Sequence, residues 1–304
     1  MSGERWPSLA LDEWRDTCAT LHMWTQVVGK VSLAKTPLIN HWWNVAFRVT
    51  SRGLTTGPML DRGRVFSIDF DFVDHRLVVT CGGEATRTMA LAPRSVAEFH
   101  RELISMLAHL DIEVRIWPVP VEVPDPIPFE RDFQHASYDA EYANRWWRIL
   151  LQAEIVLTRF RARFVGKCSP VHFFWGGFDL AVTRFSGRRA PEREDRMNRE
   201  AYSHEVISHG FWPGSGSVQM PTFYAYAAPE PDGLKAAAVR PKGAFYSREM
   251  SLIILPYDEV RRSPDPEATL LEFLQSTYEA AADLAHWDRP ELERRADPPL
   301  PGAA

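Results

Sequence analysis

The sequence predicts an α+β fold made of two tandem related repeats, packed about a pseudo-twofold axis like a dimer fused into one chain. The main observation is a pattern that occurs twice in the 304 residues. It consists of Val28-Gly29-Lys30, Thr36-Pro37, Trp42 and Val49-Thr50, which return as Val165-Gly166-Lys167, Ser169-Pro170, Trp175 and Val182-Thr183. Residues 37–50 and 170–183 align without a gap. In addition, both halves contain helix-period and strand-period segments, and a proline-rich segment separates them.

The first repeat, residues 1–117, is expected to contain a helix, four antiparallel strands and a second helix. Asp12 can cap a first helix that ends at Gly29, because glycine is favoured just past helix ends. Strands are predicted at 43–53, 66–72, 77–80 and 86–91, and in the second of these apolar residues alternate with serine and aspartate. Ser95 and Glu98 form a capping-box pattern for the closing helix, which continues to Leu110.

Residues 118–129 contain prolines at 118, 120, 124, 126 and 128 and are expected to be an extended linker. The second repeat, residues 130–288, is also predicted as helix, four antiparallel strands and helix. Its first helix is capped by Asp139 and ends at Gly166, and its closing helix begins at Pro266. Strands are predicted around 178–182, 223–227 and 250–255. Residues 289–304 are expected to be a disordered tail.

The composition is that of an ordinary soluble globular protein, with 45% hydrophobic and 25% charged residues. The net charge is -5 and the arginines are scattered among acidic residues, which argues against a nucleic-acid or membrane partner. Three separate cysteines and the absence of a signal-like apolar run favour a cytoplasmic location. The chain is tryptophan-rich, with eleven tryptophans, and most of them are expected in the core.

The two repeats differ most between their first and second strands. This connection is about twenty-five residues longer in the second repeat, where it forms an insertion at about 187–220 that is rich in aromatics and histidine. The second repeat also carries tyrosines on the strand face that bears charged residues in the first. We therefore expect a ligand pocket on the second sheet, roofed by the insertion. Its expected residues are His172, Trp175, Asp179, Tyr202, His204, Glu205, His209, Trp212, Tyr224 and Tyr226.

Two kinds of chemistry are open at this pocket. His204 and Glu205 are candidate catalytic residues, because a carboxylate that orients a histidine enables proton transfer near neutral pH. Alternatively, His172, His204 and His209 are candidate metal ligands together with the carboxylate of Glu205 or Asp179. A purely structural role, in which these histidines hydrogen-bond the insertion to the sheet, is also open. The segment from His204 to His209 does not match the zinc-protease motif, whose histidines lie four residues apart rather than five. No motif indicates a particular cofactor.

Several longer segments resemble a known family. They are Asn40-His41-Trp42-Trp43, residues 166–176, Tyr202-Ser203-His204-Glu205-Val206, residues 210–214 and residues 223–231. The chain is similar from about Trp6 to Trp287 to a family of uncharacterised bacterial proteins that is defined only as a domain of unknown function. The resemblance implies no activity and transfers no site residues.

Three functions compete on these observations. The first is binding of a small, partly apolar molecule in the aromatic and histidine-lined pocket of the second repeat, with or without catalysis. The second is an enzyme with a histidine and carboxylate site, either metal-assisted or metal-free. The third is a non-catalytic adaptor that docks a protein through exposed Phe211 and Trp212 of the insertion.

Overall fold

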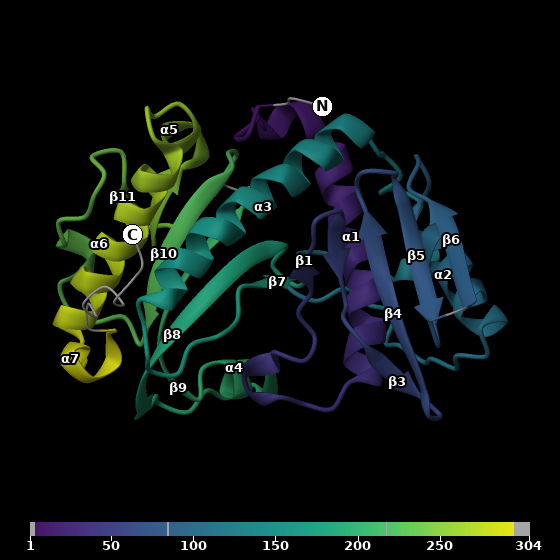
Figure 1. The fold of residues 1–304 in the computed structure, drawn as a ribbon, viewed down its shortest axis with the longest axis horizontal. Helices are drawn as coiled ribbons and strands as arrows, with labels where there is room; N and C mark the ends of the chain where they lie inside the picture. Colours follow the sequence, from purple (N-terminus) through teal and green to yellow (C-terminus); the bar gives the residue numbers. More distant parts are fainter. Residues whose placement is uncertain (1–3, 84, 217, 295–304) are drawn as a thin grey trace, which may run out of the picture.

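A computed structural model of the chain describes residues 4–83, 85–216 and 218–294. The protein is an α+β protein with two antiparallel sheets of six strands each, which lie side by side with helices packed on them (Figure 1). Seven α-helices occur within the described residues. None of the described helices is long and apolar enough to cross a membrane.

The first sheet contains the strands from residue 48 to residue 90. Its order is β1-β2-β4-β5-β6, and β3 pairs with β4 off this path. The strands are β1 (Arg48–Val49), β2 (Gly53–Thr55), β3 (Met59–Asp61), β4 (Arg64–Asp71), β5 (Arg76–Cys81) and β6 (Ala85–Ala90). Helices α1 (Leu11–Lys35) and α2 (Val96–His109) pack on the apolar face of this sheet, where Phe99 of α2 stacks between Trp24 of α1 and Phe70 of β4. The capping box of Ser95 and Glu98 at the start of α2 is confirmed.

The second sheet has the order β11-β12-β10-β9-β8-β7. Its strands are β7 (His172–Phe174), β8 (Asp179–Arg189), β9 (His204–Trp212), β10 (Thr222–Ala228), β11 (Phe245–Ser247) and β12 (Leu252–Pro256). Helices α3 (Ala140–Ala162) and α6 (Pro266–Leu284) cover one face of this sheet, as Figure 1 shows. The shorter helices are α4 (Arg196–Ala201), α5 (Tyr257–Arg261) and α7 (Arg289–Leu292), and the 3-10 turns are η1 (Asn40–Trp42), η2 (Phe129–Arg131) and η3 (Leu234–Ala236).

Several predicted elements are wrong. Each sheet has six strands rather than four. Helix α1 continues past Gly29 to Lys35, so Gly29 is not a helix end; it leaves room inside the helix for the indole of Trp175. Helix α3 ends at Ala162 rather than at Gly166. Residues 289–294 are ordered, with α7 and a backbone bridge between Phe164 and Glu293. The rest of the expected tail, 295–304, lies outside the described residues.

The segment 204–212 was expected in an insertion above the sheet and is instead β9, paired with β8 and β10. The side of β9 that faces the helices carries Ile207, His209 and Phe211, which are all buried. His209 occupies a position where an apolar residue is normal in such a strand, and Gly210 interrupts the pattern further. Residues 190–203 remain a connection between β8 and β9, and α4 lies within it.

The two sheets are joined at their edges. Backbone hydrogen bonds of 2.8 and 2.9 Å connect Phe47, just before β1, with Phe173 of β7. Helix α3 spans this junction: Asn144 donates to the Phe72 carbonyl (2.9 Å) and Trp147 donates to the Thr50 carbonyl (3.0 Å). The first and second sheets therefore form one connected unit.

The N-terminal segment packs on the second sheet. The Trp6 ring contacts Phe223 of β10 and Tyr257 of α5, and the Tyr257 hydroxyl donates to the Pro7 carbonyl at 2.8 Å. The segment before α1 thus lies on the second sheet, whose strands come from the second half of the chain.

Candidate functional site

One face of the second sheet points away from α3 and α6, and side chains along the paired parts of its strands alternate between the two faces. Phe211 and Phe223 are buried on the helix face. On the opposite face, registered neighbours place polar and small residues together. This face, called the open face below, carries Asp179, Ala181, Thr183, Ser208, Gly210, Tyr224 and Tyr226.

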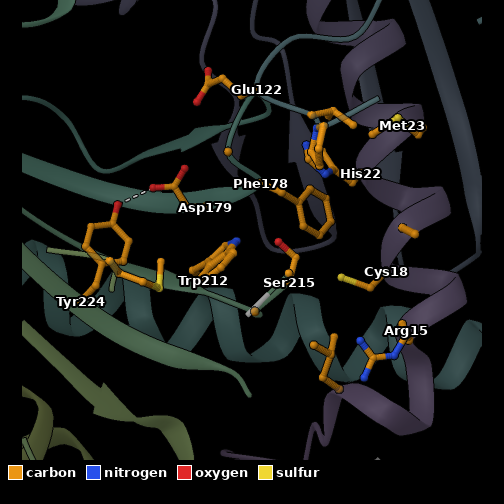
Figure 2. Close-up of a pocket in the computed structure, with 18 of the residues that line it drawn as sticks. Arg15, Cys18, His22, Met23, Glu122, Phe178, Asp179, Trp212, Ser215 and Tyr224 are labelled. Atoms are coloured by element: carbon orange, nitrogen blue, oxygen red, sulfur yellow. Dashed lines mark hydrogen bonds between the residues drawn. The ribbon is translucent and has the colours of Figure 1, made fainter. Parts of the chain in front are cut away.

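Two cavities of about 550 Å³ each adjoin the open face. The tryptophan pocket lies between the open face, the late turns of α1, η1 and α4; its residues include Lys30, His41, Trp42, Trp43, Glu122, Phe174, Trp175, Asp179, Ala181, Thr183, Phe185, Tyr202, Ser208, Tyr224 and Tyr226. The His22 pocket, drawn in Figure 2, lies along the early turns of α1; its residues include Arg15, Cys18, His22, Met23, Glu122, Phe178, Asp179, Trp212, Ser215 and Tyr224.

Asp179 and Tyr224 stand where the two pockets meet. The Tyr224 hydroxyl donates a hydrogen bond to the Asp179 carboxylate, the contact dashed in Figure 2. Burial raises the pKa of Asp179 to about 7, an effect that the Tyr224 hydrogen bond opposes and the nearby Glu122 carboxyl reinforces. A carboxyl group with this pKa exchanges its proton close to neutral pH. Burial and the Asp179 charge raise the pKa of Tyr224 well above its usual value, so Tyr224 remains a hydrogen-bond donor.

Gly210 explains how Tyr224 reaches Asp179. The two residues are registered partners on β9 and β10, and a Cβ atom on Gly210 would collide with the Tyr224 ring and with the Leu180 carbonyl. The absence of a side chain at Gly210 therefore lets the Tyr224 ring lie across β9 toward β8. A second hydroxyl pair lies beside it, with the Tyr202 and Tyr226 oxygens 3.1 Å apart.

Glu122 brings a second carboxyl group to both pockets. It belongs to the proline-rich segment 118–129 and has a left-handed backbone, with φ of 57°. Its carboxylate lies against Gly176 and Gly177, where a Cβ atom on Gly176 would collide with it. Burial raises the pKa of Glu122. Because each carboxyl group is hard to ionise here, the pair favours holding at least one proton near neutral pH.

The segment that carries Glu122 is fixed to α1 by Gln26. The Gln26 amide donates to the Val121 carbonyl (2.7 Å) and accepts from the Val121 amide (3.1 Å). One turn earlier, the His22 ring lies 2.8 Å from the Gly176 carbonyl oxygen. Burial lowers the pKa of His22 to about 4, so His22 is neutral at neutral pH and serves to position the 176–177 turn.

At the other end of the tryptophan pocket, His41 lines the cavity and lies next to further basic groups. The His41 ring bonds the Ala201 carbonyl through Nδ1 (3.0 Å), so its Nε2 accepts from the Lys167 amine (2.6 Å). His204 packs against His41, with ring centroids 5.9 Å apart. Burial lowers the pKa values of His41, Lys167 and His204. His41 and Trp42 both have positive φ, and this strained turn docks on α4.

The structure brings together part of the predicted set. Trp175, Asp179, Tyr202, Tyr224 and Tyr226 all line the tryptophan pocket. Trp212 lines the His22 pocket together with Asp179 and Tyr224. The indole of Trp175 also donates to the Val45 carbonyl at 2.8 Å, which fixes it as a wall between the two halves.

The predicted histidines do not join this group. His172 is buried beside Trp43, and burial lowers its pKa to about 4. His209 is fully buried on the helix face, where its Nε2 lies 3.0 Å from the Thr277 hydroxyl. His204 and Glu205 are successive strand residues and so point to opposite faces. Glu205 accepts from Ser186 and Arg188, which ties β9 to the end of α6.

These positions bear on the metal and docking alternatives. Within residues 4–83, 85–216 and 218–294, no group of three or more His, Cys, Asp or Glu side chains is arranged to hold a metal ion. His209 points away from His204 because their separation of five residues places them on opposite strand faces. The adaptor hypothesis requires an exposed Phe211, and that expectation is wrong, since Phe211 is fully buried in the core.

Four residues that line the site are absent from the predicted set: Glu122, Lys30, Trp42 and Trp43. The sequence places Glu122 in the expected linker and Lys30 just past the expected helix end at Gly29, and it favours core packing for most tryptophans. For Glu122 a signal existed: an acidic residue between prolines, in a stretch with Val121 and Val123, differs from an ordinary solvated linker. For Trp42 and Trp43 only the fold shows that one half of the chain completes the site of the other.

The fold and site define an α+β protein with two antiparallel sheets and an aromatic pocket lined by residues from both halves of the chain. A family model described as "Family of unknown function (DUF5996)" matches residues 6–294. The chain therefore belongs to this family, DUF5996. No curated protein and no solved structure matches the chain significantly.

Proposed function

We propose that this protein binds a small, partly apolar molecule in the tryptophan pocket. The observation that carries the proposal is the pocket itself: a cavity of about 550 Å³ with aromatic walls and a hydrogen-bonded tyrosine and carboxyl floor. That volume and that mixture of apolar walls with few polar groups are typical of small-molecule sites. The pocket also uses residues from both halves of the chain, as expected of a site that needs the whole fold.

The polar groups in the pocket suit a ligand with a hydrogen-bonding end. A protonated Asp179 donates a hydrogen bond and an ionised one accepts, so the floor adapts to either kind of partner. Tyr202 and Tyr226 offer a further hydroxyl pair beside it. We also propose that the partner is a small molecule and neither a nucleic acid nor a membrane, because the net charge is -5 and many arginines form ion pairs with acidic residues over the surface.

Acid–base catalysis is a second candidate function, favoured by the pair of Asp179 and Glu122. Two carboxyl groups that both resist ionisation and face the same cavities can divide the roles of proton donor and acceptor. We place this chemistry at Asp179 and Glu122 in preference to His204 and Glu205, which face opposite ways.

We further propose that the two halves are duplicated copies of one ancestral unit. In support, each half has a helix before and a helix after an antiparallel sheet, and the aligned stretches 37–50 and 170–183 end in β1 and β8. Under this proposal the copies keep six strands each but diverged in strand order, and only the second carries an open face with tyrosines.

The binding proposal is tested by filling the pocket. Ala181 is buried in the floor, so Ala181→Phe places a ring inside the cavity, whereas Ala238→Phe places the same ring on an exposed loop. A library of aromatic and heterocyclic metabolites is screened by thermal shift. Ligands are expected to raise the Tm of the wild type and of Ala238→Phe, because binding stabilises the folded state, and to leave Ala181→Phe unchanged.

Equal shifts in all three proteins, or no shift from any compound, would refute the pocket as a binding site. Should Ala181→Phe fail to fold, Ala181→Leu repeats the test with a smaller side chain. Activity assays on any compound found this way, in the wild type and in Asp179→Asn, then separate catalysis from simple binding.

A further inference from the structure

Lys30 is a largely buried lysine that lines the tryptophan pocket. It lies on α1, one turn after Gln26, and is only 5% exposed. Among the described residues it forms no hydrogen bond and no ion pair. An ammonium group that is largely withdrawn from water and has no partner in the protein is costly, and an anion that enters the pocket would offset this cost.

The usual structural role of such a lysine does not apply here. A cation near a helix C-terminus offsets the negative end of the helix dipole, and the effect is confined to the last turn. Helix α1 ends at Lys35, and Lys35 is the cation of its last turn, paired with Asp61 at 2.6 Å. Lys30 lies more than one turn before that end.

The acidic residues of the pocket do not neutralise Lys30 either. Glu122 and Asp179 line the same cavity, yet neither forms an ion pair with it. Asp179 is engaged by Tyr224, and Glu122 lies against the 176–177 turn. The amine therefore remains available to a group that enters the cavity.

We propose that Lys30 binds the acidic group of the ligand, and that the ligand is an organic anion with an apolar body. This inference rests on the proposed function of the tryptophan pocket. The indoles of Trp42, Trp43 and Trp175 cover the body of such a molecule, and Lys30 pairs with its carboxylate or similar singly charged group. A small inorganic anion leaves the aromatic walls unused, and a neutral molecule leaves the buried amine unpaired.

The test uses two fluorescent probes with the same ring system. Anilinonaphthalene sulfonate carries an acidic group, and N-phenyl-1-naphthylamine does not. Affinities are measured by fluorescence titration for the wild type, Lys30→Met, Lys30→Gln and Lys242→Met. Lys242 is exposed and outside the pocket, so its substitution removes the same charge elsewhere. Circular dichroism establishes that each variant is folded.

Both Lys30 variants are expected to bind the sulfonate about tenfold or more weakly, since a charge-assisted hydrogen bond is lost, and to bind the neutral probe within about twofold of the wild type. Lys242→Met is expected to bind both probes like the wild type. Equal changes for both probes, or no change for either, would overturn the role of Lys30 while leaving the pocket proposal intact. Binding of both probes that survives Ala181→Phe would instead overturn the pocket proposal.

Discussion

At the scale of single residues, the site depends on carboxyl groups held where ionisation is unfavourable. Asp179 lies at the start of β8, at the junction of two cavities, and the Tyr224 hydroxyl is its main compensating contact. Burial outweighs that hydrogen bond, so the pKa of Asp179 is raised to about 7. Burial also raises the pKa of Glu122. A carboxyl group whose pKa is raised in this way lowers the stability of the folded protein when it is ionised.

The raised pKa of Asp179 predicts a pH-dependent stability. Between about pH 4 and pH 7 the folded protein keeps a proton on Asp179 that the unfolded chain releases, so this residue lowers stability as the pH rises. The substitution Asp179→Asn removes this loss of stability, because asparagine does not ionise. At pH 8 we expect the variant to be more stable than the wild type by roughly 1–3 kcal/mol, with the difference vanishing near pH 4. Urea unfolding at several pH values measures it.

The exposed Asp232→Asn substitution is the matched control, and its effect should not vary with pH in this way. A difference between Asp179→Asn and the wild type that stays constant from pH 4 to pH 8 would contradict the raised pKa.

The sequence pattern predicted that the tyrosines and Asp179 lie together at one cavity, and they do. It also predicted three histidines there, and these line neither of the two cavities. Asp179, Tyr224 and Tyr226 were predictable because alternation along a strand assigns each residue to a face. His209 was not, because a buried histidine that bonds Thr277 has the same sequence pattern as one that faces a ligand. Glu122 and Lys30 depend on contacts between segments about ninety residues or more apart, such as that of Gln26 with Val121.

At the scale of elements, α1 serves both halves of the molecule. One side packs with α2 over the first sheet, and another borders both cavities on the second. Gly29 makes the close approach possible, since its missing side chain leaves room for the Trp175 indole. The sequence motif Val28-Gly29-Lys30 therefore marks a packing contact in the middle of a helix, and its resemblance to a helix end misled the prediction of the boundary.

Gly29→Ala tests this contact. In an ordinary helix the change stabilises by about 1 kcal/mol, because alanine has the higher helix propensity. Here the added methyl group collides with Trp175, so we expect a net destabilisation of roughly 1–3 kcal/mol in urea unfolding, as for other overpacked cores. In a Trp175→Leu background the collision is relieved and Gly29→Ala should become neutral or stabilising. A stabilising effect in the wild-type background would show that the contact is not tight.

At the scale of the whole molecule, the two sheets are not independent bodies. They share the Phe47–Phe173 bridge, and the buried Trp146 of α3 contacts both Phe72 of the first half and Phe173 of the second. The α+β class and the helices flanking each sheet were predictable from periodicity. Neither the edge-to-edge junction nor the extra strands were, because strands of two or three residues carry too little pattern to be recognised.

This junction predicts cooperative behaviour. Thermal unfolding of the intact chain should follow a single transition by circular dichroism and by tryptophan fluorescence alike. Fragments 1–117 and 130–294, produced separately, should lack a cooperative transition, because each exposes the apolar surface that Trp146, Phe72 and Phe173 bury together. Two separated transitions in the intact chain, or a fragment that unfolds cooperatively, would show that the halves are autonomous.

The placement of Trp6 and Pro7 on the second sheet has a consequence for the order of events during synthesis. Tyr257, which contacts Trp6 and donates a hydrogen bond to the Pro7 carbonyl, is synthesised 250 residues after Pro7. At the usual pace of translation that interval is roughly 12–50 s. Until the second sheet is synthesised, Trp6 lacks its contacts with Phe223 and Tyr257. The start of the chain is therefore among the last parts to reach its final position.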